Sequence, residues 1–184
     1  MQFRKNPIMS LLGIIAAWYF LVISGNLSID LSPLGIEIPI TLQSLAVLII
    51  GGLLGPYLSA AAVLAYLFTG AYGFTTFANG AYGYAVLAGK TGGFLISFIP
   101  AAFFVGWFNN PKTDTTSLKL IKGILGGTGI ILILGYMRLL KFLDWDIAFT
   151  KGILPFIPGA LFKGLIAFLL LNMINKLLQL RTPE

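Results

Sequence analysis

A glycine-rich stretch from Ala71 to Gly93 gathers the side chains of this chain best suited to recognising a small molecule. Asn79 carries an amide that both donates and accepts hydrogen bonds, and Lys90 carries a cation. Glycine lets a ligand approach the backbone closely. Rigid aromatic walls could come from Phe77, Tyr82 and Tyr84. The stretch therefore predicts a ligand site, with a glycine-rich connector between helices as the alternative.

A second candidate is Lys163, which follows Pro158 and Gly159 early in an apolar run. A charge inside a membrane segment is costly and by default marks a functional site. The nearby start of a helix favours anions. Lys163 therefore predicts a site for an anionic group such as a carboxylate. The alternative is a lysine whose ammonium reaches the membrane boundary.

Several chemistries are excluded by residue type. The chain has no histidine and no cysteine, so the commonest general base and the usual metal ligands are missing. Gly89–Thr91 imitates the end of a phosphate-binding P-loop, but Tyr84 stands where that motif needs glycine. We therefore expect a binding protein with no metal and no cofactor. Serine–lysine catalysis is the one enzymatic alternative left open.

Composition places the chain in a membrane. Of its 184 residues 58% are hydrophobic and only 10% are charged, whereas soluble proteins carry about 25% charged residues. Mean hydropathy is +0.93. The bilayer is therefore an expected partner, and one integral membrane domain over residues 1–184 fits the length. The net charge of +6 is explained by topology, and no nucleic-acid partner is expected.

The elements that must position these side chains are apolar runs between polar or glycine-rich breaks. We expect transmembrane helices over residues 8–24, 41–54, 57–70, 92–108, 118–136 and 155–178. This even number puts both termini on one side. More of the lysines and arginines fall on that side, which favours an orientation with N- and C-termini in the cytoplasm. Loops 26–39, 72–91 and 138–151 then meet on the outer face.

The first apolar run carries two further features. Its basic start resembles a signal peptide, but the run is long and its cleavage pattern is poor, so a first transmembrane helix is the better interpretation. Gly13 and Ala17 form a small-xxx-small face. Such a face lets another helix approach closely, so we expect a partner-helix face, with internal packing as the alternative.

Five short motifs resemble the BioY family, the biotin-specific substrate-binding (S) components of energy-coupling factor (ECF) transporters. In chain order they are PITLQSL at 39–45, GLLGP at 52–56, FANG at 77–80, GKTGG at 89–93, and PFIPG at 155–159 with Lys163. The resemblance covers residues 39 to about 170. Each motif alone is weak, and their order together is specific.

This resemblance implies an all-α, six-helix membrane fold with a biotin pocket closed by loops at the outer face. It implies a partner module of one membrane coupling protein and two ATPases, and a place in the cytoplasmic membrane of a prokaryote. The residues that we expect to bind biotin are Gln43, Phe77, Asn79, Gly80, Tyr82, Tyr84, Lys90, Gly92, Gly93, Gly159 and Lys163.

The chain departs from the family pattern at three positions. Ala160 stands where the family usually has Asp, one helical turn from Lys163, so Lys163 must find another partner. Lys90 replaces a usual Pro, and Tyr57 replaces a common Arg. The first two changes fall on the expected site and predict a different affinity or ligand orientation.

The predicted function is therefore biotin binding for uptake, through or without an ECF ATPase module. Asn79 and Gln43 would bond the ureido group, and Lys163 or Lys90 would neutralise the carboxylate. Which end of biotin meets Lys163 stays open. The alternatives are an S component for another small vitamin, favoured by Ala160, a membrane enzyme acting on lipid, and a structural helix-packing subunit.

Overall fold

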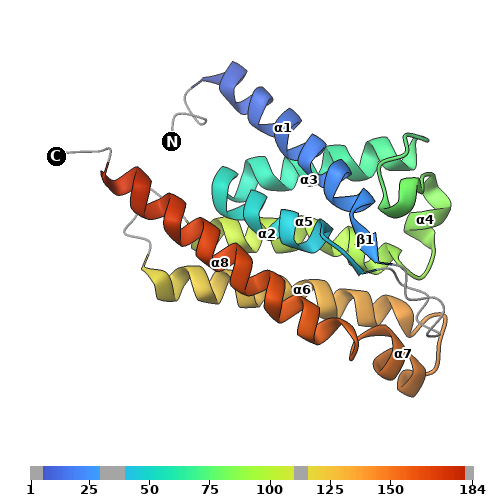
Figure 1. The fold of residues 1–184 in the computed structure, drawn as a ribbon. Helices are drawn as coiled ribbons and strands as arrows, with labels where there is room; N and C mark the ends of the chain where they lie inside the picture. Colours follow the sequence, from blue (N-terminus) through green and yellow to red (C-terminus); the bar gives the residue numbers. More distant parts are fainter. Residues whose placement is uncertain (1–5, 30–39, 110–115, 181–184) are drawn as a thin grey trace.

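The computed structural model describes residues 6–29, 40–109 and 116–180 (Figure 1). Each of the six apolar runs corresponds to one long helix. These helices are α1 (Pro7–Asn26), α2 (Gln43–Leu54), α3 (Pro56–Ala71), α5 (Gly92–Phe108), α6 (Ser117–Leu139) and α8 (Phe156–Leu180). Three short helices were not expected from the sequence: η3 (Ala78–Gly80), α4 (Tyr84–Ala88) and α7 (Trp145–Gly152).

Local signals set the helix ends. Asn6 caps α1, because its side chain accepts a hydrogen bond of 3.0 Å from the Ile8 N–H. Thr116 caps α6 through the Lys119 N–H in the same way. Gly55 has a φ of 77°, a conformation that glycine adopts readily, and it separates α2 from the Pro56 that begins α3.

Two short strands join the end of α1 to the start of α2. β1 (Ser28–Ile29) pairs antiparallel with β2 (Ile40–Thr41), and Ser28 lies opposite Thr41. The sequence predicted only a loop here. The greater part of that loop, residues 30–39, lies outside the described residues, as do Arg4, Lys5 and several other charges used to predict the orientation.

Helix α5 lies at the centre of the bundle, in contact with α2, α3 and α6. Helix α1 covers α2 and α3, and α8 packs along α2 and α6. The start of α1 and the end of α8 lie at one end of the bundle, whereas α4, α7 and β1 lie at the other (Figure 1). We call the second of these the α4 end.

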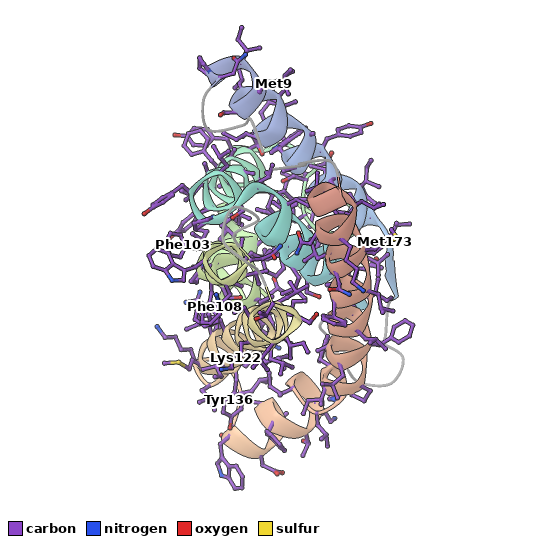
Figure 2. All side chains as sticks on the ribbon, turned by 90° about the vertical axis from the view of Figure 1, so that its left-hand side faces the viewer. Met9, Phe103, Phe108, Lys122, Tyr136 and Met173 are labelled. Atoms are coloured by element: carbon purple, nitrogen blue, oxygen red, sulfur yellow. The ribbon has the colours of Figure 1, made fainter. Side chains whose placement is uncertain are left out.

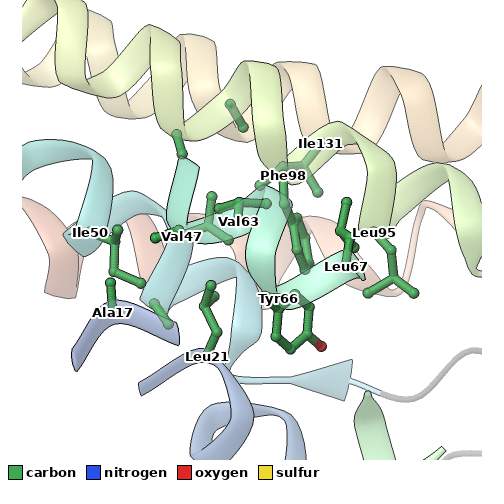
Figure 3. Close-up of a cluster of buried hydrophobic side chains, with 14 of the residues drawn as sticks. Ala17, Leu21, Val47, Ile50, Val63, Tyr66, Leu67, Leu95, Phe98 and Ile131 are labelled. Carbon is green, nitrogen blue, oxygen red and sulfur yellow. The ribbon is translucent and has the colours of Figure 1, made fainter. Parts of the chain in front are cut away.

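The largest buried cluster joins α1, α2, α3 and α5 (Figure 3). Ala17 and Leu21 of α1 pack there with Val47, Ile50 and Tyr66. Gly13 is buried as well. In this structure the small-residue face of α1 therefore packs against other helices of the same chain. This corresponds to internal packing, the alternative to a face for a partner helix.

A polar contact joins three helices at the end opposite α4. The side-chain amide of Asn109, which is fully buried, donates to the Gly52 carbonyl oxygen at 2.8 Å. The Asn175 amide donates in turn to Asn109 Oδ1 at 2.8 Å. A buried polar group without a partner is costly, so this chain of bonds fixes α2, the end of α5 and α8 relative to one another.

The outside of the bundle is largely apolar. Large hydrophobic side chains project outward from the helices, among them Met9 and Met173, which are 38% and 53% exposed (Figure 2). Three helices are long and apolar enough to cross a bilayer by themselves: Pro7–Asn26, Ser117–Leu139 and Phe156–Leu178. So much apolar surface exposed to water would be unfavourable, so the chain is an integral membrane protein.

Candidate ligand-binding site

A cavity of about 370 Å³ lies near the α4 end, between α2, α5, α6, α8 and residues 78–91. Its size falls in the range of small-molecule sites, roughly 300 to 1,000 Å³. Most of the lining is apolar, including Leu48, Phe77, Phe94, Leu95, Phe98, Ile131, Leu132 and Phe156. The side chains with polar groups are Thr41, Gln43, Ser44, Thr91, Thr128 and Lys163. An apolar chamber with a few polar anchors suits a small amphipathic ligand.

Lys163 is the only lysine or arginine that lines the cavity, within the parts of the chain that the structure describes. Its ammonium donates to the Thr41 carbonyl oxygen at 2.7 Å and to Ser44 Oγ at 3.1 Å. Both partners are neutral, and Ala160 supplies only a methyl group to the same cavity. An ammonium has three N–H donors, so one remains for a ligand atom.

Gln43 is held in place by a buried hydrogen-bond chain. Its side-chain amide donates to the Tyr66 hydroxyl, and its carbonyl oxygen accepts from Thr41 Oγ1 at 3.2 Å. Tyr66 also meets Phe77 edge to face, with ring centroids 5.5 Å apart. Tyr66 is fully buried and does not line the cavity. Tyr66 therefore orients the lining residues Gln43 and Phe77 from outside the cavity.

One wall of the cavity, residues 78–91, contains η3 and α4; we call it the α4 segment. Arg138 of α6 holds its end. Arg138 Nε donates to the Gly89 carbonyl oxygen at 3.2 Å, and Nη2 donates to that of Ala88. These carbonyls lie at the end of α4, where a cation is favourable, and that of Gly89 also accepts from the Gly92 N–H at 3.3 Å. The guanidinium also lies 5.2 Å from the Phe142 ring centroid.

Asn79 and Gly80 are not among the residues that line the cavity. Asn79 is exposed and has a φ of 56°, and Gly80 has a φ of 71°. The Asn79 side-chain oxygen accepts a hydrogen bond from the Ser28 hydroxyl. In this structure Asn79 therefore joins the segment to β1, and neither residue lines the cavity.

The two expected aromatic walls and Lys90 also lie outside the cavity lining. Tyr82 is 58% exposed and Tyr84 is 74% exposed, so both rings face the surroundings. Lys90 is half-buried beside the lining residues Gly89 and Thr91. The cavity wall that was expected from Tyr82 and Tyr84 comes instead from phenylalanines of α5 and α8.

Of the three remaining glycines, Gly92 and Gly93 act on packing in this structure. A Cβ on Gly92 would collide with the Leu87 carbonyl oxygen, and one on Gly93 would lie 2.7 Å from the Leu134 carbonyl oxygen. These two residues therefore let α5 approach α4 and α6. Gly159, beside the lining residue Ala160, has open space around its Cα. None of the three lines the cavity, whereas Gln43, Phe77 and Lys163 do.

Sequence reasoning missed several polar lining residues, above all Ser44 and Thr128. Ser44 lies in the PITLQSL motif, one turn after Thr41 and next to Gln43. Its place in that motif could therefore have identified it as a lining residue. Thr128 lies in a glycine-rich apolar helix with nothing to mark which side faces a cavity. Among the described residues there is also no group of three or more acidic, histidine or cysteine side chains that could hold a metal ion.

Comparison with known proteins identifies the family of this chain. The family model described as "BioY family" matches residues 2–180. A relative from Thermotoga maritima, "Biotin transporter BioY", is 35% identical over 178 residues, which are 96% of this chain and 96% of that protein. Another from Rhodobacter capsulatus with the same description is 38% identical over 152 residues, covering 73% of this chain and 80% of the relative.

A solved structure has the same fold. It is a crystal structure of the S-component for biotin from an ECF-type ABC transporter, with a TM-score of 0.80 and 25% sequence identity. The match covers 94% of this chain and 93% of that one. The sequence match over nearly the whole chain and the shared helical fold lead to one conclusion: this chain belongs to the BioY family.

Proposed function

We infer that this chain is the biotin-binding, substrate-specific subunit of a biotin uptake system. The observation that carries the inference is the mostly apolar cavity of about 370 Å³ with the Lys163 ammonium in its wall. Biotin has an apolar thioether ring and chain, a polar ureido group and a carboxylate. The phenylalanine lining suits the apolar parts, and Lys163 suits an oxygen at either polar end.

Binding is the function, and no bond of the ligand is broken. The BioY relatives are described as transporters. The polar residues around the cavity hold one another: Lys163 donates to Thr41 and Ser44, and Gln43 donates to Tyr66. Such preorganised groups stabilise one ligand orientation. Ser44 and Lys163 form a serine–lysine pair, but the ammonium donates to the hydroxyl and so is not placed to take the serine proton as a base.

The subunit works within the cytoplasmic membrane of a prokaryote, with an ECF module of one membrane coupling protein and two ATPases as the partner. The solved S-component of an ECF-type transporter supports this partner. We propose six membrane crossings with both termini in the cytoplasm. The start of α1 and the end of α8 at one end of the bundle support an even number of crossings (Figure 1).

Several expected site residues lie in or beside the α4 segment without lining the cavity. Their proposed role is to close the cavity over bound biotin. Asn79 joins this segment to β1, Gly92 lets α5 lie close to Leu87 of the segment, and Gly93 lets α5 lie close to α6. A direct contact of Asn79, Tyr82, Tyr84 or Lys90 with biotin requires the segment to move inward. Gly80 and Gly159 would act through the backbone.

Calorimetric titration of the detergent-solubilised protein with biotin tests the function, with Lys163→Met and Asn79→Ala alongside. We expect one-to-one binding that Lys163→Met weakens by tenfold or more, about 1.4 kcal/mol. Asn79→Ala should have a smaller effect if its contact with Ser28 is its main role. Absence of biotin binding by the unmodified protein at millimolar concentration would contradict the inference.

A second candidate ligand is another small heterocyclic vitamin, and Ala160 in the cavity wall favours it, because a methyl group leaves more room beside Lys163. Competition of a panel of vitamins against labelled biotin separates the two. Displacement by another vitamin at a lower concentration than by unlabelled biotin would assign that vitamin as the substrate.

A further inference from the structure

Thr128 of α6 carries a buried hydroxyl without a partner. Its Oγ1 makes no hydrogen bond to any described residue, and Thr128 lines the cavity. A buried hydroxyl left unpaired is unfavourable, so each such group calls for an explanation. Thr76 Oγ1 is also unpaired, but Thr76 lies outside the cavity lining.

The hydroxyl of Thr128 differs from the buried hydroxyls of the other helices. Serine and threonine in a helix usually donate back to a carbonyl three or four residues earlier. Ser59 does so to Gly55 at 2.7 Å, and Thr69 does so to Ala65 at 2.9 Å. Thr128 makes no such bond. Because Thr128 lines the cavity, a rotation about its χ1 would turn this unpaired hydroxyl toward a molecule bound there.

The register of α6 and α8 places Thr128 near Lys163. The two helices run antiparallel (Figure 1), and a Cβ on Gly164 would lie 3.4 Å from Ile124 Cγ2. One turn further toward the α4 end, Thr128 of α6 and Ala160 of α8 lie at the same level. Lys163 follows Ala160 by three residues, on the same side of α8. All three residues line the cavity.

We propose that the Thr128 hydroxyl is a ligand anchor, which binds the polar end of the ligand that also meets Lys163. The ammonium can only donate, whereas a hydroxyl both donates and accepts. Together they match a ureido group, which has N–H donors and a carbonyl oxygen, or a carboxylate, which accepts from both. Ala160 opposite leaves the space for that group. This proposal rests on the biotin-binding function inferred above.

The test compares biotin affinity of Thr128→Val, Thr128→Ser and the unmodified protein by calorimetry. Valine keeps the shape and removes the hydroxyl, and serine keeps the hydroxyl. We expect valine to weaken binding about five- to tenfold, the scale of one hydrogen bond, and serine to weaken it less than about threefold. As a matched control, Ser59→Ala removes a buried helical hydroxyl away from the cavity and should leave affinity unchanged.

Thermal unfolding without ligand separates an anchor from a structural residue. Removal of an unpaired buried hydroxyl should leave the midpoint of the ligand-free protein equal or higher, while biotin affinity falls. A structural role would instead lower both. Should Thr128→Val fail to fold, the difference in affinity between Thr128→Ser and Thr128→Ala isolates the hydroxyl in the same way.

An analogue with a methyl group in place of the carboxyl identifies the bonded end. If Thr128 bonds the carboxylate, this analogue will bind the valine variant and the unmodified protein equally well. If Thr128 bonds the ureido group, the analogue will keep the difference in affinity between the two proteins. Equal biotin affinity of Thr128→Val and the unmodified protein, or equal loss in valine and serine variants, would overturn the proposal. Failure of the unmodified protein to bind biotin would instead overturn the proposed function.

Discussion

Replacement of Arg138 by methionine should loosen the α4 segment and speed the loss of bound biotin. Arg138 Nε and Nη2 donate to the carbonyls of Gly89 and Ala88, at the end of α4. Methionine keeps an apolar stem beside Gly93, where Arg138 Cβ and Cγ pack closely. The substitution therefore removes the guanidinium and preserves most of the packing between α5 and α6.

The size of the effect follows from these two bonds. A hydrogen bond from a charged donor contributes about 1.5 to 3 kcal/mol. Arg138 is half-buried, so water reaches its guanidinium and replaces part of this energy when the segment opens. We take about 2 kcal/mol for the pair, because solvent screens exposed charges. At 1.4 kcal/mol for each tenfold change, opening becomes about 30-fold more frequent.

Hydrogen exchange measured by mass spectrometry checks this prediction on the biotin-bound protein. Peptides covering residues 84–91 should exchange about 30-fold faster in Arg138→Met, while those of α2 and α3 keep their rates. Arg138→Lys retains the charge and one donor and should show a smaller increase. Lys141→Met removes an exposed cation nearby and serves as the control for charge. Unchanged exchange over residues 84–91 in Arg138→Met would refute the reasoning.

Two more substitutions separate orientation of the cavity wall from stability of the bundle. Tyr66→Phe leaves the buried Gln43 amide without its acceptor. We expect a loss of about 1 to 3 kcal/mol in unfolding free energy and weaker biotin binding. Unchanged affinity would show that Tyr66 does not orient Gln43. Asn109→Leu removes the bonds to Gly52 and Asn175 at the opposite end. It should lower the thermal midpoint by a similar free energy with biotin affinity retained, and a large loss of affinity would contradict the separation of the two ends.

The long helices were predictable because their apolar runs end at strong local signals. Gly55 and Pro56 separate α2 from α3, and polar residues follow α5. The short helices α4 and α7 were missed for a related reason. They lie in glycine-rich or charged stretches, where residue types favour loops, and contacts such as that of Arg138 with the end of α4 hold the helical turns.

The cavity lining was harder to predict than the helices. A membrane helix is apolar on the side facing lipid and on the side facing the protein, so hydropathy does not tell them apart. Phe94 lines the cavity, whereas Phe68 of α3 is 62% exposed, and nothing in their residue type separates them. Lys163 was predictable because its charge cannot face lipid at low cost. Tyr82 and Tyr84 were expected in the cavity wall because they lie in the glycine-rich stretch. Their place in the sequence does not tell which way the rings point, and both rings are exposed.

The short length of α2 has a consequence for the surrounding lipid. Its 12 residues span about 18 Å at 1.5 Å per residue, against a hydrocarbon layer about 30 Å thick. Where α2 and the 16-residue α3 border lipid, the bilayer must become locally thinner to match their length. The protein should consequently be most stable in bilayers of short-chain phospholipids, and its thermal midpoint should fall as acyl chains lengthen in a reconstitution series.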